Sequence, residues 1–169
     1  IAAGCGSATV DPEKSNTQTA RGENDEEHTS RTSELTERDL EVVEFVLRRN
    51  PTKSNGRIYF LTTTPMEEWS DDGGWESLPD SFHEQIEDLP ANYRPASEAT
   101  LREHSVFEKS TDNEAWIEWV TIKKWISDTE VEVEQGVWCC PLGGGAGTAI
   151  YEKVDGEWRF KESVSGWVS

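Results

Sequence analysis

The sequence predicts an α+β fold in which an N-terminal helix packs on a curved antiparallel sheet. Residues 34–49 carry apolar side chains near helical spacing, and residues 130–139 alternate between apolar and polar side chains as strands do. The pair Asp155-Gly156 separates two further strand-like segments and is typical of a tight β-hairpin. Because a chain of 169 residues usually forms a single core, we expect one domain spanning residues 34–169.

Both ends of the predicted helix are marked in the sequence. Its larger apolar residues are Leu35, Leu40, Val43, Phe45, Val46 and Leu47. Thr36 is followed three residues later by Asp39, an arrangement that caps a helix N-terminus. Asn50-Pro51 then ends the helix, because proline cannot continue it.

The remaining segments predict a second short helix and a series of strands. That helix begins with a cap formed by Ser81 and Glu84 and ends at Pro90. The expected strands cover residues 57–62, 100–108, 115–126, 130–139, 148–154 and 157–164. The glycine run 143–147 lacks the lysine and following helix of a phosphate-binding loop, so we interpret it as a hairpin loop or a bulge.

Small residues precede a cysteine near the start of the chain, in the order Ala2-Ala3-Gly4-Cys5. This order resembles the end of a bacterial lipoprotein signal peptide. The resemblance implies that Cys5 carries a lipid and that the protein is exported and membrane-anchored at the cell envelope. The following residues up to Ser33 are polar and cannot bury enough apolar area to fold. We therefore interpret residues 1–33 as a signal-peptide remnant and a disordered tether.

The C-terminal part of the chain, from about residue 112, resembles a second group. Long antiparallel strands end in Tyr151-x-x-x-Asp155-Gly156-x-Trp158-x-Phe160, which is similar to the last hairpin of cystatin-like and NTF2-like domains. The resemblance implies a cone between helix and sheet that can hold a ligand. The enzymes of the NTF2-like group place an Asp–His pair in that cone, and no such pair can be matched to this chain.

The charge of the chain restricts its partners. It has 34 acidic residues against 16 lysines and arginines, a net charge of -18, which would repel DNA and RNA. So many carboxylates make any acid pair uninformative, and we predict no catalytic residues, no cofactor and no metal site. His83 and Glu87 could reach one cation, or act as an acid–base pair, from one helix face, although a solvated face is the simpler interpretation.

Tryptophan is unusually frequent, with eight residues, and two roles stay open. The indoles could fill a small core, or some could form a partly exposed platform for a sugar or a partner protein. The candidates for the platform are Trp69, Trp75, Trp119 and Trp125. Regular alternation along residues 115–126 places Trp119 and Trp125 on the same face, opposite the face of Val120, Ile122 and Ile126 that should pack on the helix.

Cys139 and Cys140 are adjacent, and alternation points their side chains to opposite faces of a strand. Two free thiols, a strained vicinal disulfide and a metal site all stay open, although zinc would require further ligands at a recognisable spacing. Taken together, the sequence predicts a lipid-anchored, non-catalytic domain that binds an unknown protein, small molecule or glycan. An NTF2-like enzyme and a carbohydrate-binding module are the alternatives.

Overall fold

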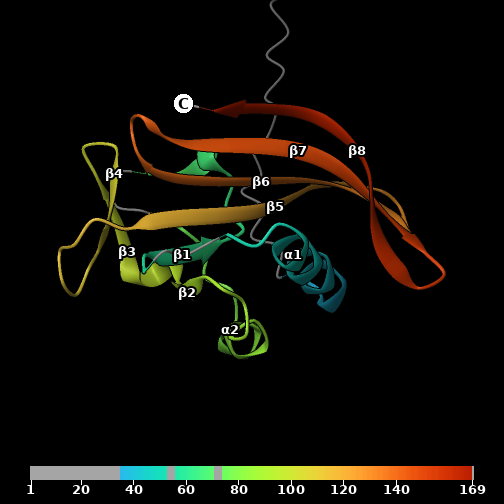
Figure 1. Cartoon of the computed structure of the whole chain (residues 1–169), viewed down its shortest axis with the longest axis horizontal. Helices are drawn as coiled ribbons and strands as arrows, with labels where there is room; N and C mark the ends of the chain where they lie inside the picture. Colours follow the sequence, from blue (N-terminus) through green and yellow to red (C-terminus); the bar gives the residue numbers. More distant parts are fainter. Residues whose placement is uncertain (1–34, 53–55, 71–73, 169) are drawn as a thin grey trace, which may run out of the picture. The chain divides into compact units, whose positions relative to one another are not determined.

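A six-stranded sheet forms the centre of the computed structural model, which describes residues 35–52, 56–70 and 74–168 (Figure 1). Its strands are β1 (Ile58–Thr62), β2 (Asn92–Pro95), β5 (Trp116–Ser127), β6 (Glu130–Cys140), β7 (Gly143–Val154) and β8 (Glu157–Val168), in the spatial order β2-β1-β5-β6-β7-β8. The predicted tether and the predicted lipidation site Cys5 lie outside the described residues.

The sheet is mixed rather than antiparallel throughout. Strands β5 to β8 form the predicted antiparallel meander, whereas β1 pairs in parallel with both β2 and β5. Parallel neighbours require a crossover connection, and the long segment between β1 and β5 supplies it. This segment holds the short helix α2 (Asp80–Gln85), two 3₁₀ turns, η1 (Met66–Glu68) and η2 (Ala96–Glu98), and the hairpin of β3 (Ala99–Arg102) and β4 (Ser105–Glu108).

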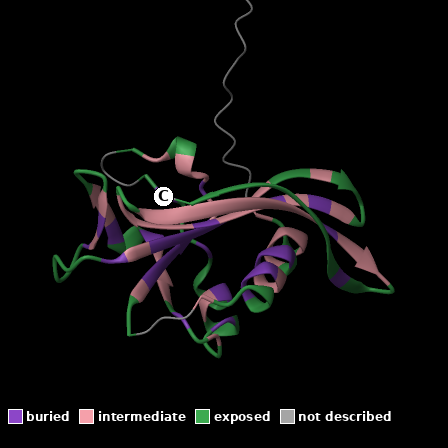
Figure 2. Cartoon of the chain, turned by 45° about the horizontal axis from the view of Figure 1, so that its top comes forward, coloured by how far each residue is buried: buried purple, intermediate pink, exposed green. Residues whose placement is uncertain are grey.

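Helix α1 (Glu37–Arg49) covers one face of the sheet, which confirms the predicted α+β arrangement. The predicted cap at its start is present, because the Thr36 side chain accepts a hydrogen bond from the Asp39 backbone and Asp39 returns one. Its buried face consists of Val42, Val43, Val46 and Leu47. These side chains share one apolar cluster with strand residues such as Leu61, Val120 and Val133. Burial is concentrated in this helix and the central strands, while β8 is exposed along nearly all of its length (Figure 2).

Helix α2 is shorter than predicted and has no side-chain cap. It begins after Pro79, not at the expected cap residue Ser81, and its N-terminal N–H groups bond to the Pro79 carbonyl. Phe82 and Ile86 nevertheless join the same apolar cluster as α1. Burial of these two side chains therefore holds α2 in place where intrinsic helix signals are weak.

The opposite face of the sheet has its own apolar cluster, formed by Phe60 of β1, Ile117 of β5, Trp75 and residues of the β3–β4 hairpin. Sequence alternation predicted residues 100–108 as one strand, but they fold back as this hairpin. The turn lies at Glu103 and His104, which both adopt positive φ angles, of 49° and 64°. The domain thus has a helical layer on one side of the sheet and a small hairpin layer on the other.

A β-bulge in β5 corrects the predicted faces of that strand. Ile122 pairs with Val133, but Lys124 and Trp125 pair with the next two residues of β6, so one residue of β5 is unmatched. Beyond this point the side chains exchange faces. Trp125 therefore packs against the helix-side cluster, and Ile126, expected to face the helix, is 44% exposed.

The glycine run is part of β7, not a loop. Residues 143–147 pair with β6 on one side, and Gly145 to Gly147 also pair with β8. Backbone pairing on both sides orders a segment whose composition is typical of a loop.

Among the described residues, no helix is long and apolar enough to cross a membrane.

Candidate functional site

A groove of about 570 Å³ lies on the helix-facing side of the sheet, where the C-terminal end of α1 leaves the strands uncovered. Its floor consists of Gly145, Gly147 and Ala149 of β7, with Ser163 and Ser165 of β8 beside them. Because these side chains are small or absent, they leave an open space above the strands. The groove therefore exists where the glycine run replaces the large side chains that fill the sheet under α1.

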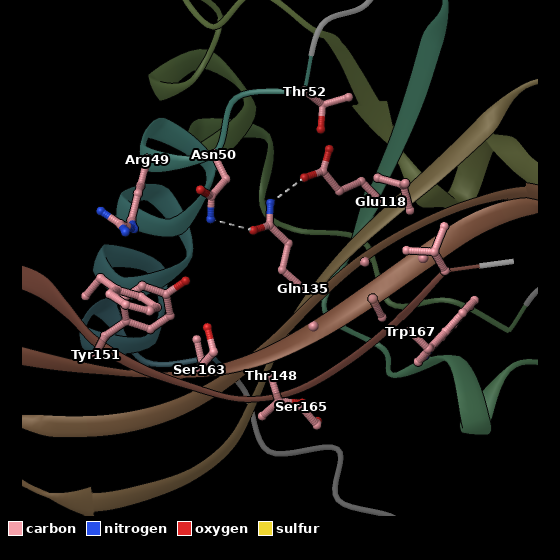
Figure 3. A pocket seen from close by; sticks show the side chains of 18 residues that line it. Arg49, Asn50, Thr52, Glu118, Gln135, Thr148, Tyr151, Ser163, Ser165 and Trp167 are labelled. Atoms are coloured by element: carbon pink, nitrogen blue, oxygen red, sulfur yellow. Dashed lines mark hydrogen bonds between the residues drawn. The ribbon is translucent and has the colours of Figure 1, made fainter.

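A chain of polar groups closes one side of the groove (Figure 3). Gln135 of β6 donates a hydrogen bond to a Glu118 carboxylate oxygen at 2.8 Å and accepts one from the Asn50 side chain at 3.2 Å. The Tyr93 hydroxyl donates to the second Glu118 oxygen at 2.8 Å. Thr52 also lines this side of the groove. The groups come from four different segments, so only the folded domain brings them together.

Glu118 is the most unusual member of this chain because it is a carboxylic acid with no exposed surface. No basic side chain forms a salt bridge with it among the described residues. Burial raises the pKa of Glu118 above its ordinary value, although hydrogen bonds from Gln135 and Tyr93 act in the opposite direction. A buried acid of this kind in a groove is a typical feature of functional sites.

The raised pKa predicts how Glu118 changes stability with pH. The folded state holds the Glu118 proton to higher pH than the unfolded chain does, so this carboxyl stabilises the fold at low pH, and the stabilisation is lost as the pH rises through its folded pKa. Glu118→Gln removes the titration. We expect the free energy of unfolding of wild type to fall relative to that of Glu118→Gln as the pH rises from 4 to 8. Urea denaturation of both proteins measures this difference.

Glu157→Gln is the matched control, since Glu157 lies exposed at the start of β8. The same unfolding series on this variant measures how removal of an exposed carboxylate changes stability with pH, and the rise for Glu118→Gln should exceed it. A Glu118→Gln difference that does not rise above that of the control would contradict the raised pKa of Glu118.

Aromatic and apolar side chains line the rest of the groove. Val168 of β8 is 90% exposed, and Phe160 of the same strand is 37% exposed. The Trp167 ring lies 6.2 Å from that of Trp138, on the hairpin-facing side of the sheet. Near the end of α1, the Arg49 guanidinium lies 4.6 Å above the Phe160 ring, and Tyr151 lies beneath Phe160 at 6.0 Å. The groove thus offers apolar surface along most of its length and hydrogen-bonding groups around Glu118.

No family model matches this chain. No curated protein and no solved structure matches it either. The chemistry of the site is therefore derived from its own residues.

The tryptophans predicted as a platform lie elsewhere in the domain. Trp69 stacks edge-on against both Trp75 and Trp119, with ring centroids 5.7 and 5.2 Å apart. Trp119 has no exposed surface and Trp75 only 8%. On the helix side, Trp125 lies between the Arg38 guanidinium and the Trp158 ring, and its indole N–H donates to Asp39. These four indoles pack in or against the core, and a ligand role for them stays a prediction.

His83 lies on α2, away from the groove. It is half-buried, and burial lowers its pKa below the usual histidine value. Both of its ring nitrogens are buried without a hydrogen-bond partner among the described residues. Glu87 is exposed four residues later. In the part of the chain that the structure describes, no three His, Cys, Asp or Glu side chains are placed to hold a metal ion.

The sequence did not single out Glu118 or Gln135 as site residues. Glu118 had one detectable signal, since it is an acid within the apolar run Trp116-Ile117-Glu118-Trp119-Val120 and has the parity of the helix-facing residues. Gln135 had none, because its position at the groove depends on strand register.

Proposed function

We propose that this protein binds a small organic ligand in the groove between the end of α1 and strands β5 to β8. The single observation that carries the proposal is the groove itself, because a buried carboxylic acid without a salt bridge and the partly exposed Phe160 ring line one open space of about 570 Å³. Ligand sites usually have volumes of about 300–1,000 Å³, mostly apolar walls and a few convergent polar groups. The arrangement of a helix over a curved sheet also supports the likeness to cystatin-like and NTF2-like domains.

The lining indicates the chemistry of the ligand. Its polar end would hydrogen-bond with the groups around Glu118, such as Gln135 and Asn50, and its apolar body would lie on the glycine floor against Phe160. The net charge of -18 disfavours an anionic ligand. We therefore propose an uncharged or cationic molecule with one polar end. Lipid attachment at Cys5 would hold this binding domain at the cell envelope, as the residues before that cysteine suggest.

The test is a screen of a small-molecule fragment set, including monosaccharides and short glycans, by ligand-observed NMR. We expect fragments with a polar end to bind wild type and to lose binding in Gly147→Leu, which fills the groove floor. For the tightest fragment, Phe160→Ala should weaken the affinity by roughly tenfold or more, as truncation of an aromatic contact residue often does.

Glu157→Leu is the control, because it adds the same side chain to an exposed position of β8 that does not line the groove. Fragment binding should survive this change. Fragments that bind Gly147→Leu as well as wild type, or no bound fragments at all, would contradict the proposal.

A second function, catalysis in the same groove, is favoured by Glu118 alone. Burial raises the pKa of Glu118, and a carboxyl with a raised pKa can act as a general acid or base. Incubation of each bound fragment with wild type and with Glu118→Gln separates the two functions. Conversion by wild type only would assign an enzyme, whereas unchanged fragments with both proteins support a binding domain.

A further inference from the structure

A second pocket, of about 430 Å³, contains both cysteines of the described chain. Arg57, Trp116 and Glu114 line it together with Cys139 and Cys140. The Arg57 guanidinium lies 4.8 Å above the Trp116 ring. This pocket is distinct from the groove and shares no lining residue with it.

A β-bulge brings the two thiols together. In the ladder between β6 and β7, Trp138 pairs with Gly144 and Cys140 pairs with Gly143, so Cys139 is an extra residue. On a regular strand adjacent side chains point to opposite faces, but a bulge redirects one of them. The two Sγ atoms consequently lie 2.8 Å apart, in hydrogen-bond contact.

The neighbouring strand is adapted to this pair. The Cys139 thiol donates a hydrogen bond to the Gly143 carbonyl at 3.2 Å. A side chain at position 143 would collide with both sulfur atoms. Glycine at this position therefore leaves the two sulfurs free to approach each other.

We propose that Cys139 and Cys140 form a reversible dithiol–disulfide pair that exchanges with small-molecule disulfides entering this pocket. In the first step one cysteine, as its thiolate, attacks a sulfur of the small disulfide. A mixed disulfide forms, and one small thiolate leaves and takes up the proton. The second cysteine then attacks the cysteine sulfur of the mixed disulfide, closes the Cys139–Cys140 bond and releases a second small thiol. The cysteine pair loses two electrons and two protons, and the small disulfide gains them.

The ligand set favours this chemistry over a metal site, because no three His, Cys, Asp or Glu side chains are placed to hold a metal ion among the described residues. Burial and the contact with Cys140 raise the pKa of the Cys139 thiol to about 12, so attack by its thiolate should be slow at neutral pH and faster at alkaline pH. A disulfide is uncharged and avoids the cost of a buried thiolate. Because a single peptide bond closes the ring, such a disulfide is strained, and strained disulfides are the easily reduced ones.

The experiment treats the full-length chain with oxidised glutathione, blocks remaining thiols with N-ethylmaleimide and examines the tryptic peptide 125–153 by mass spectrometry. This peptide contains Cys139 and Cys140 but not Cys5. We expect the unblocked peptide to appear with the loss of two hydrogens, and excess reduced glutathione to restore the doubly blocked form. In Cys140→Ser, glutathione should instead accumulate on Cys139.

Two results would overturn the proposal. One is a wild-type peptide that remains doubly blocked in oxidised glutathione, and the other is a peptide that carries two glutathiones without closing the ring. Phenylarsine oxide gives an independent readout of the geometry, because its arsenic binds two neighbouring thiols with release of water. It should add to wild type and not to Cys140→Ser, and failure to add to wild type would count against the pair.

Discussion

Replacing Trp119 by alanine should lower the free energy of unfolding by about 3–5 kcal/mol, the range for truncating large buried aromatic side chains. The Trp119 ring has no exposed surface and stacks edge-on against Trp69 at 5.2 Å. Its indole N–H donates to Glu134 at 2.8 Å. The truncation removes this packing and leaves the Glu134 oxygen without its indole donor.

Trp167→Ala is the matched control for this prediction, measured by urea denaturation with far-ultraviolet circular dichroism. Trp167 is 42% exposed, and its loss should change the free energy of unfolding by less than about 1 kcal/mol. Equal losses of unfolding free energy for the two variants would show that burial of the Trp119 ring contributes no more to stability than the exposed Trp167 ring does.

Gly136→Ala should lower the free energy of unfolding by about 1–3 kcal/mol, as overpacking of a filled core does. Gly136 pairs directly with Trp119 across β5 and β6. A Cβ at this position would collide with the Cε2, Cζ2 and Cη2 atoms of the indole. The ring lies over the glycine, so the strand tolerates no side chain here while Trp119 is present.

The double variant provides the decisive measurement. In the Trp119→Ala background the collision is gone, and alanine should be no worse than glycine in a strand. We therefore expect Gly136→Ala to be neutral or stabilising in that background. Gly147→Ala is the control in wild type, because its Cβ would lie 3.5 Å from the Ser165 carbonyl oxygen, an ordinary contact. A full cost of Gly136→Ala in both backgrounds would assign the effect to the backbone instead of to the indole.

The sequence predicted most of the elements because their signals are local. The cap formed by Thr36 and Asp39, the alternation of β6 and the turn at Asp155-Gly156 all act between residues close in the chain. Each was confirmed in place. The strand ends were less accurate, since β8 extends to Val168 where residue 164 was expected. Pairing with the glycine run of β7 extends it, and that pairing is not a local property.

Features that depend on register could not be predicted in the same way. Alternation assumes two residues per repeat, and one extra residue exchanges the faces of everything that follows. The bulge in β5 moved Trp125 to the helix side, and the bulge in β6 brought Cys139 and Cys140 together. Nothing in the order of residues marks either bulge, because the cost of an unmatched residue is offset by packing on distant strands.

The candidate site likewise combines features that local sequence predicts with features that depend on contacts between distant residues. Composition and spacing by themselves determined an acidic α+β domain, its N-terminal helix and its C-terminal hairpin. Only the tertiary structure placed Glu118 beside Gln135, Tyr93 and Asn50 and opened a groove over the glycines of β7. The physical reason is that helix and turn signals arise from neighbours in the chain. The burial of an acid and the width of a groove are set instead by side chains that lie far apart in the sequence.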